Sequence, residues 1–227
     1  MKKFTTLASV LLLAFLIPAH ASLITIAEWN FNFEESTDRV PGHEEVVEAD
    51  VGDGLLFVVN GPTFGTNFAR DTSGGTLVNA SDGTAAGGRL GFDRRERWHN
   101  GVFDIRVNTT GLEDIHFSFA MDFSSDGPND ITVAWTVDEG DTLNTLETIE
   151  KDFGWTRFAY DLSGEQGVNN QENLWFRFTF ASEGGGAASG GYAMRLDNVI
   201  VTAIPEPGTL VLLGIALGFL VHFSRRR

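Results

Sequence analysis

Two-residue alternation of apolar and polar side chains is the feature that most constrains how this chain can fold. It is clearest in four segments, EWNFNFE (28–34), HFSFAMDF (116–123), ITVAWTVD (131–138) and LWFRFTF (174–180). Successive side chains of a β-strand point to opposite faces, so each segment predicts a strand with one apolar, largely aromatic face and one polar face. No helical period is sustained between residues 22 and 204, so no helix is expected there.

Shorter strand-like segments complete this pattern, at residues 55–59, 76–79, 102–107, 155–161 and 194–202. Stretches rich in glycine, aspartate and serine separate them and indicate turns. About nine or ten short strands, each with one polar face, need a second sheet to cover their apolar faces. The chain is therefore predicted to be all-β, an antiparallel two-sheet β-sandwich of the jelly-roll type, rather than a parallel α/β sheet.

The amino-terminal end has the organisation of a secretory signal peptide. Lys2 and Lys3 precede an apolar run at residues 7–17, and Ala19 and Ala21 form a small-x-small cleavage site. We expect a signal peptide at residues 1–21, cleaved after Ala21, and export of the remaining chain from the cytoplasm.

The carboxyl-terminal end carries a short apolar run between two distinctive motifs. Pro205, Glu206 and Pro207 precede apolar residues 209–223, and three arginines close the chain. A helix over 209–223 would be about 22 Å long at 1.5 Å per residue, against a hydrocarbon core of about 30 Å. We expect one short transmembrane helix, with the arginines on the cytoplasmic side.

This order of features resembles the PEP-CTERM sorting signal of Gram-negative bacteria. The resemblance implies recognition at Pro205-Glu206-Pro207 by an exosortase-type processing enzyme. It also implies transient residence in the inner membrane, then delivery to the cell surface or extracellular matrix. The chain would divide into a signal peptide (1–21), a β-sandwich ectodomain (22–204) and a sorting signal (205–227), which ends at the stop residues Arg225, Arg226 and Arg227.

Charge and cysteine content exclude several classes of function. Of 31 acidic and 16 basic residues, only Glu206, Lys2, Lys3 and the three terminal arginines lie outside residues 22–204, which leaves that segment a formal charge of −19. This negative charge disfavours the binding of nucleic acid and other polyanions. It is compatible with the binding of cations or neutral glycans, or with a role in solubility alone. The chain has no cysteine, which excludes disulfides, thiol nucleophiles and cysteine-ligated metals.

The first and last strand segments resemble those of jelly-roll carbohydrate-binding modules. The resemblance rests on Asn32-Phe33-Glu34 near the start and on residues 195–199 (RLDNV) near the end. It implies a structural Ca²⁺ held by an early carboxylate, Glu34 or Glu28, and by Asp197, together with other oxygen ligands. The start of the chain lacks the compact Asn-Gly-x-Phe-Glu form of those modules.

No catalytic motif stands out, so no enzyme is expected. The histidines at positions 43, 99 and 116 are far apart, and there is no His-Glu-x-x-His pair, Gly-x-Ser-x-Gly elbow, phosphate-binding loop or dinucleotide fingerprint. A glycoside hydrolase built on two carboxylates is the least favoured alternative.

Two functional interpretations remain open. The first is an exported, non-catalytic structural protein of the cell surface or matrix. The second is an exopolysaccharide-binding module, in which Trp98 would stack on a sugar beside Arg97 and Asn100, with Trp175 as a second platform. A simpler interpretation of these residues is that the arginines pair with acids, Trp98 fills the core and Trp175 packs against Arg177.

Overall fold

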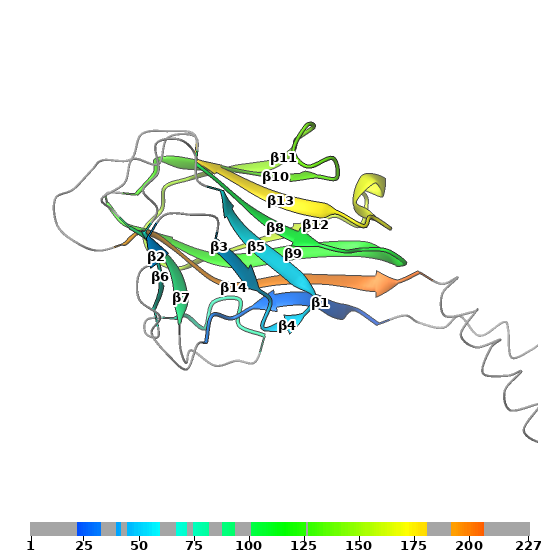
Figure 1. Ribbon diagram of the computed structural model, residues 1–227, viewed down its shortest axis with the longest axis horizontal. Coiled ribbons are helices and arrows are strands. Elements are labelled where there is room, and N and C mark those ends of the chain that lie inside the picture. Colours follow the sequence, from blue (N-terminus) through cyan, green and yellow to red (C-terminus); the bar gives the residue numbers. More distant parts are fainter. Residues whose placement is uncertain are drawn as a thin grey trace, which may run out of the picture.

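The computed structural model describes residues 22–32, 40–41, 45–59, 67–71, 75–81, 88–93, 101–125, 127–180 and 192–206. These residues form fourteen strands and one short 3-10 turn (Figure 1). The elements are β1 (Ile24–Trp29), β2 (Val40–Pro41), β3 (Glu45–Glu48), β4 (Val51–Gly52), β5 (Gly54–Val59), β6 (Asn67–Asp71), β7 (Arg89–Asp93), β8 (Val102–Val107), β9 (Leu112–Phe123), β10 (Asp130–Thr136), β11 (Asn144–Glu150), β12 (Thr156–Asp161), η1 (Gln166–Val168), β13 (Leu174–Phe180) and β14 (Tyr192–Pro205).

The strands form two sheets, and within each sheet every pair of neighbouring strands is antiparallel. The eight-stranded sheet has the order β12-β9-β14-β7-β6-β2, with β1 also paired to β14 and β4 to β1. The six-stranded sheet has the order β11-β10-β13-β8-β5-β3. The prediction of an all-β, jelly-roll-like sandwich is confirmed.

Strand β14 organises the eight-stranded sheet. It pairs with β9 along most of its 14 residues, and on its other side with β7 near its start and with β1 near its end. The register shifts between Asp197 and Ile200, where Asn198 takes a left-handed backbone φ of 48°. Because of this bulge, the consecutive polar side chains of Asp197 and Asn198 both face a chain segment outside the sheet.

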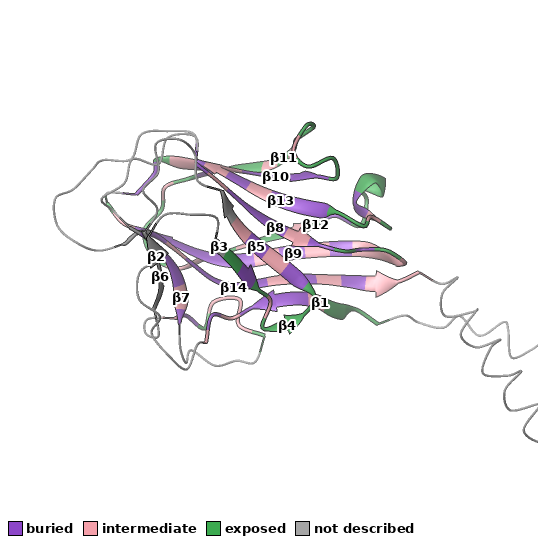
Figure 2. Cartoon of the chain, in the orientation of Figure 1, coloured by how far each residue is buried: buried purple, intermediate pink, exposed green. Residues whose placement is uncertain are grey.

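The core lies between the sheets, where Figure 2 shows buried strand residues. Phenylalanine is the most frequent residue type among the buried residues that the structure describes. Phe117 of β9 stacks on Phe176 of β13 with ring centroids 4.0 Å apart, and Phe103 of β8 stacks on Phe178 at 4.2 Å. All four rings are fully buried, and each such burial stabilises the fold by about 1.5–3 kcal/mol. The apolar faces predicted for residues 117–123 and 174–180 are therefore the core faces of β9 and β13.

One edge of the sandwich is held by a hydrogen bond between the sheets. The Tyr160 hydroxyl of β12 donates to Glu147 Oε2 of β11 at 2.9 Å. Burial and this carboxylate raise the pKa of Tyr160 well above its usual value, so the phenol stays protonated and remains a donor.

Three local predictions were wrong. Residues 76–79 form a bend and turn rather than a strand. The first strand ends at Trp29, because the Asn30 and Phe31 N–H groups donate to the Asp50 carboxylate and Phe31 takes a φ of 51°. Val137 lies beyond the end of β10 and is 37% exposed, outside the core row.

Six strands were not predicted from the sequence, and four of them, β2, β3, β4 and β11, lie at sheet edges; the other two are β6 and β7. Within the part of the chain that the structure describes, no helix is long and apolar enough to cross a membrane. The predicted signal peptide (1–21) and transmembrane helix (209–223) lie outside that part.

Candidate functional site

The predicted site residues fall into two groups. Glu28, Trp175, Asp197, Pro205 and Glu206 are described by the structure. The others lie outside the described residues and stay predictions: Ala19, Ala21, Glu34, Arg97, Trp98, Asn100, Pro207, Arg225, Arg226 and Arg227.

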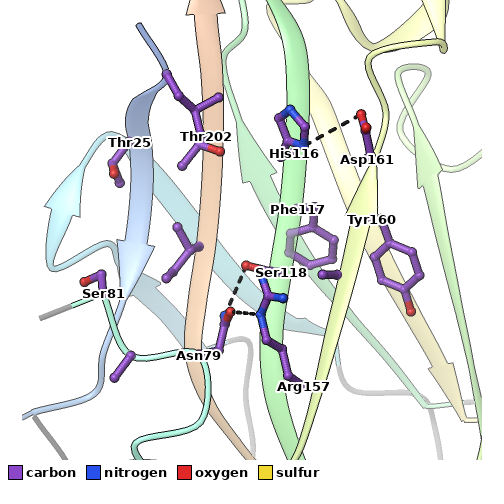
Figure 3. A pocket seen from close by; sticks show the side chains of 14 residues that line it. Thr25, Asn79, Ser81, His116, Phe117, Ser118, Arg157, Tyr160, Asp161 and Thr202 are labelled. Atoms are coloured by element: carbon purple, nitrogen blue, oxygen red, sulfur yellow. Dashed lines mark hydrogen bonds and ion pairs between the residues drawn. The ribbon is translucent and has the colours of Figure 1, made fainter. Parts of the chain in front are cut away.

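A groove of about 670 Å³ lies on the outer face of the eight-stranded sheet (Figure 3). Strands β1, β9, β12 and β14 form its floor, and residues 75–81 contribute to its wall. Because side chains alternate along a strand, the polar positions opposite the phenylalanine core face outward here. They include Thr25, His116, Ser118, Arg157, Asp161 and Thr202.

The wall is a non-strand segment, residues 75–81, which we call the pinned segment. Its attachment comes mainly from the bulge in β14. The Asn198 side-chain amide donates to the backbone oxygens of Thr76 and Val78 at 2.7 and 3.0 Å. The Asp197 carboxylate accepts the Thr76 N–H at 2.8 Å, and Ser81 Oγ donates to Glu28 Oε1. Buried polar groups thus hold this segment against the sheet.

Asn79 connects the pinned segment to the groove. Its backbone φ of 62° is left-handed, and its side-chain amide donates to the Asn198 oxygen at 2.7 Å and to Ser118 Oγ at 3.1 Å. Its Oδ1 accepts the Arg157 Nε–H at 2.7 Å, as Figure 3 shows. This contact fixes the direction of the Arg157 guanidinium at the groove.

A second polar pair lies farther along the same face. His116 Nδ1 is 3.7 Å from Asp161 Oδ1, and the two side chains are 39% and 66% exposed. Hydrogen bonds from Ser163 are the main reason that the pKa of Asp161 is lowered, with His116 contributing less. An exposed pair of this kind is screened by solvent and contributes little to stability. Together these groups offer hydrogen-bond donors and acceptors to a ligand.

The two predicted calcium ligands that the structure describes are both buried. Asp197 is 2% exposed and Glu28 is 6% exposed, and both are attached to the pinned segment. Burial raises the pKa of Asp197 to about 7. Among the described residues, no three or more histidine, aspartate or glutamate side chains are grouped as a metal site would require. Glu34 lies outside those residues, so the calcium site stays a prediction.

Trp175 lies on the outer face of the other, six-stranded sheet, and it is covered. Its ring is 7% exposed, and the Arg106 guanidinium carbon lies 3.7 Å from its centroid and 3.8 Å from that of Phe57. Arg177, expected to pack on Trp175, also lies over this ring, with its guanidinium carbon 5.8 Å from the ring centroid, and it binds Asp104 through two hydrogen bonds of 2.7 and 2.9 Å. The ring is therefore not the open platform that the sequence suggested.

Sequence reasoning missed the residues that shape the groove, above all Asn79 and Arg157. For Asn79 one signal was available in the sequence, because asparagine is among the few residues that tolerate a left-handed backbone and is therefore common in turns. Asp197 was identified only as a candidate calcium ligand. Its role, with Asn198, in attaching residues 75–81 depends on contacts more than 110 positions apart along the chain.

The sorting-signal residues described here belong to the folded domain. Pro205 is the last residue of β14 and lies opposite Leu112 in the β14–β9 ladder. The Glu206 N–H donates to the Gly111 oxygen at 2.9 Å. The β-sandwich therefore continues without a spacer into the Pro-Glu-Pro motif.

Several solved structures are similar to this chain at low sequence identity. A CBM4 structure is 14% identical, covers 77% of this chain and 97% of its own, and gives a TM-score of 0.42. A family 29 carbohydrate-binding module, CBM29-2, is 11% identical, with coverages of 83% and 96% and a TM-score of 0.37. The glycoside hydrolase domain of Endo-D from Streptococcus pneumoniae R6 is 16% identical, with coverages of 66% and 21% and a TM-score of 0.37. With TM-scores below 0.5, these likenesses carry no conclusion about ligand or activity.

No curated protein sequence is similar to this chain. One family description does match, over the last 25 residues only. Residues 203–227 match the PEP-CTERM protein-sorting motif, so the β-sandwich carries this sorting motif at its carboxyl end.

Proposed function

We propose that this protein is exported, held briefly in the inner membrane by residues 209–223, and processed at Pro205-Glu206-Pro207 by an exosortase-type enzyme. Processing delivers the β-sandwich to the cell surface or extracellular matrix of a Gram-negative bacterium. The match of residues 203–227 to the PEP-CTERM protein-sorting motif is the observation that carries this proposal.

The test is to express the full chain in a Gram-negative host with and without an exosortase-type enzyme. Mass spectrometry of the exported protein should show a chain shortened near residue 207 only when the enzyme is present. Glu206→Gln should impair processing, whereas Glu172→Gln, at an exposed position outside the motif, should not. Release of the same product in both hosts would contradict the proposal.

We further propose a non-catalytic, structural role in the matrix. The support is that the described groups with shifted pKa values take part in structural contacts. Asp138, whose pKa is lowered to about 2, accepts hydrogen bonds from Thr136 and Thr142 within one turn. Arg177 is held by Asp104. Deleting the protein should weaken biofilm cohesion, and unchanged cohesion and surface composition would contradict a structural role.

Carbohydrate binding is the second candidate function, and the polar groove is the observation that favours it. Retention of the protein on its host's extracellular polysaccharide, with and without Ca²⁺, tests this function as a whole. Loss of retention in a folded Trp98→Ala variant would place the binding site at that tryptophan, and retained binding would exclude it.

A further inference from the structure

The groove on the eight-stranded sheet offers hydroxyl groups beside a small apolar surface. Thr25, Ser118 and Thr202 supply the hydroxyls, and Ala159 and Ile200 supply the apolar surface. Ligand sites typically combine apolar lining with a few directed polar groups. A ligand that fits this groove must itself carry hydroxyl groups on one side and C–H groups on the other.

Arg157 supplies the strongest directed donors at this site. Its Nε–H is committed to Asn79, which orients the guanidinium plane. Within the part of the chain that the structure describes, its two terminal nitrogens make no hydrogen bond, and the side chain is exposed. Two parallel N–H groups in a fixed plane match a pair of neighbouring ligand oxygens.

Energetically unfavourable features support the position of this arginine. Asn79 and Asn198 both adopt left-handed backbone angles, and Asp197 is ionisable yet buried. Strained residues of this kind persist where the surrounding structure holds them, and they cluster at functional sites. Here they keep the pinned segment, and with it Asn79 and Arg157, in one position.

The charge of the domain disfavours polyanionic ligands. Residues 22–204 carry a formal charge of −19, and one of these carboxylates, Asp161, lines the groove. Such a field repels polyanions before they reach the groove. A polysaccharide without acidic groups avoids this repulsion and still offers paired hydroxyl oxygens.

We infer that this groove binds a neutral polysaccharide chain, with Arg157 donating to neighbouring sugar hydroxyls and with Ala159 and Ile200 contacting the sugar rings. The inference rests on the second candidate function above. It places the binding site on the eight-stranded sheet, away from Trp175 on the six-stranded sheet.

The test is affinity electrophoresis of the detergent-solubilised full chain through gels that contain a neutral galactomannan, a neutral mixed-linkage β-glucan or anionic alginate. The wild type should be retarded by at least one neutral polymer and not by alginate. Failure of both neutral polymers to retard the wild type would overturn the inference. Retardation by alginate alone would overturn the neutral-ligand assignment.

Two variants separate the groove from carbohydrate binding in general. Ala159→Trp should fill the groove, and Arg157→Ala should remove the donors; each should lower affinity about tenfold or more, while Arg157→Lys should restore part of it. Thr145→Trp, at an exposed position on β11 of the other sheet, is the matched control and should bind as the wild type does. Normal binding by folded Ala159→Trp and Arg157→Ala would overturn the groove assignment and leave carbohydrate binding in place.

Discussion

Asp197 is a buried carboxylate that serves as an attachment point for another chain segment. Its two oxygens accept the N–H groups of Thr76 and Asn198, both at 2.8 Å. Hydrogen bonds to the ionised form lower a carboxyl pKa, whereas burial raises it. Burial dominates here, with Arg89 opposing it weakly, and the pKa rises to about 7. This carboxyl group therefore loses its proton at a much higher pH than an exposed aspartate does.

The raised pKa of Asp197 predicts a pH-dependent stability in metal-free buffer. The folded state binds the proton more tightly than the unfolded state, whose pKa is near 3.8. The stabilisation of the folded state by the protonated Asp197 carboxyl is fully present below about pH 4. It is lost as the pH rises through 7, by about 1.4 kcal/mol for each pKa unit of difference between the folded and unfolded states. The unfolding free energy of the wild type minus that of Asp197→Asn, measured in EDTA, should fall across this range. A constant difference would contradict the raised pKa.

At the scale of single residues, alternation predicted which side chains are buried but not which ones touch. The core positions Phe117 and Phe178 were predicted correctly because period-2 alternation separates the two faces of a strand. The cover that Arg106 provides for Trp175 could not be predicted, because it depends on β8 lying beside β13. The Arg157–Asn79 contact likewise joins residues 78 positions apart.

At the scale of elements, the pinned segment shows why a strand-like pattern can mislead. The sequence TLVN contains the β-branched and apolar residues typical of a short strand, yet Leu77 is 58% exposed and Asn79 has a left-handed backbone. Its backbone groups bond to the Asn198 and Asp197 side chains instead of to a neighbouring strand. Long alternating segments were predicted well, whereas the two-residue strands β2 and β4 are too short to show a period.

Asn198→Ala should release the pinned segment from β14. The change removes two side-chain hydrogen bonds and places a residue with a poorly tolerated left-handed backbone at the bulge, for a cost of about 2–4 kcal/mol. Amide hydrogen exchange at Thr76 should accelerate. Asn198→Gly keeps the backbone angle accessible and should destabilise less. Unchanged exchange at Thr76 in the alanine variant would show that Asn198 does not hold the segment.

At the scale of the whole molecule, the all-β class and the two-sheet architecture were predictable, but strand order was not. Each long alternating strand shows in its own sequence that it needs cover on one face. The order of the strands within a sheet depends on pairings such as β14 with β7 and β1 with β14, which bring distant parts of the chain together. The sorting signal was predictable because it consists of a local order of residues.

The predicted calcium would act on the stability of the whole sandwich. A cation bound only to the folded state raises its melting temperature, and it would also favour the ionised form of a buried carboxylate such as Asp197. We expect EDTA to lower the melting temperature of the wild type at pH 7.5 and to leave that of Asp197→Ala unchanged. An unchanged melting temperature of the wild type in EDTA would contradict the predicted calcium site.

The junction at Glu206 also has a mechanical consequence. Ile24 lies opposite Ala203, so the first and last strands are neighbours, and the chain leaves the sandwich directly from the end of β14 (Figure 1). A force that reaches Glu206 from the carboxyl side therefore enters the long β14–β9 ladder directly. Pulled along its own direction, such a ladder loads many hydrogen bonds together rather than one after another. While the tail is intact, the domain would act as a stiff anchor point whose lifetime under load is set by its unfolding rate.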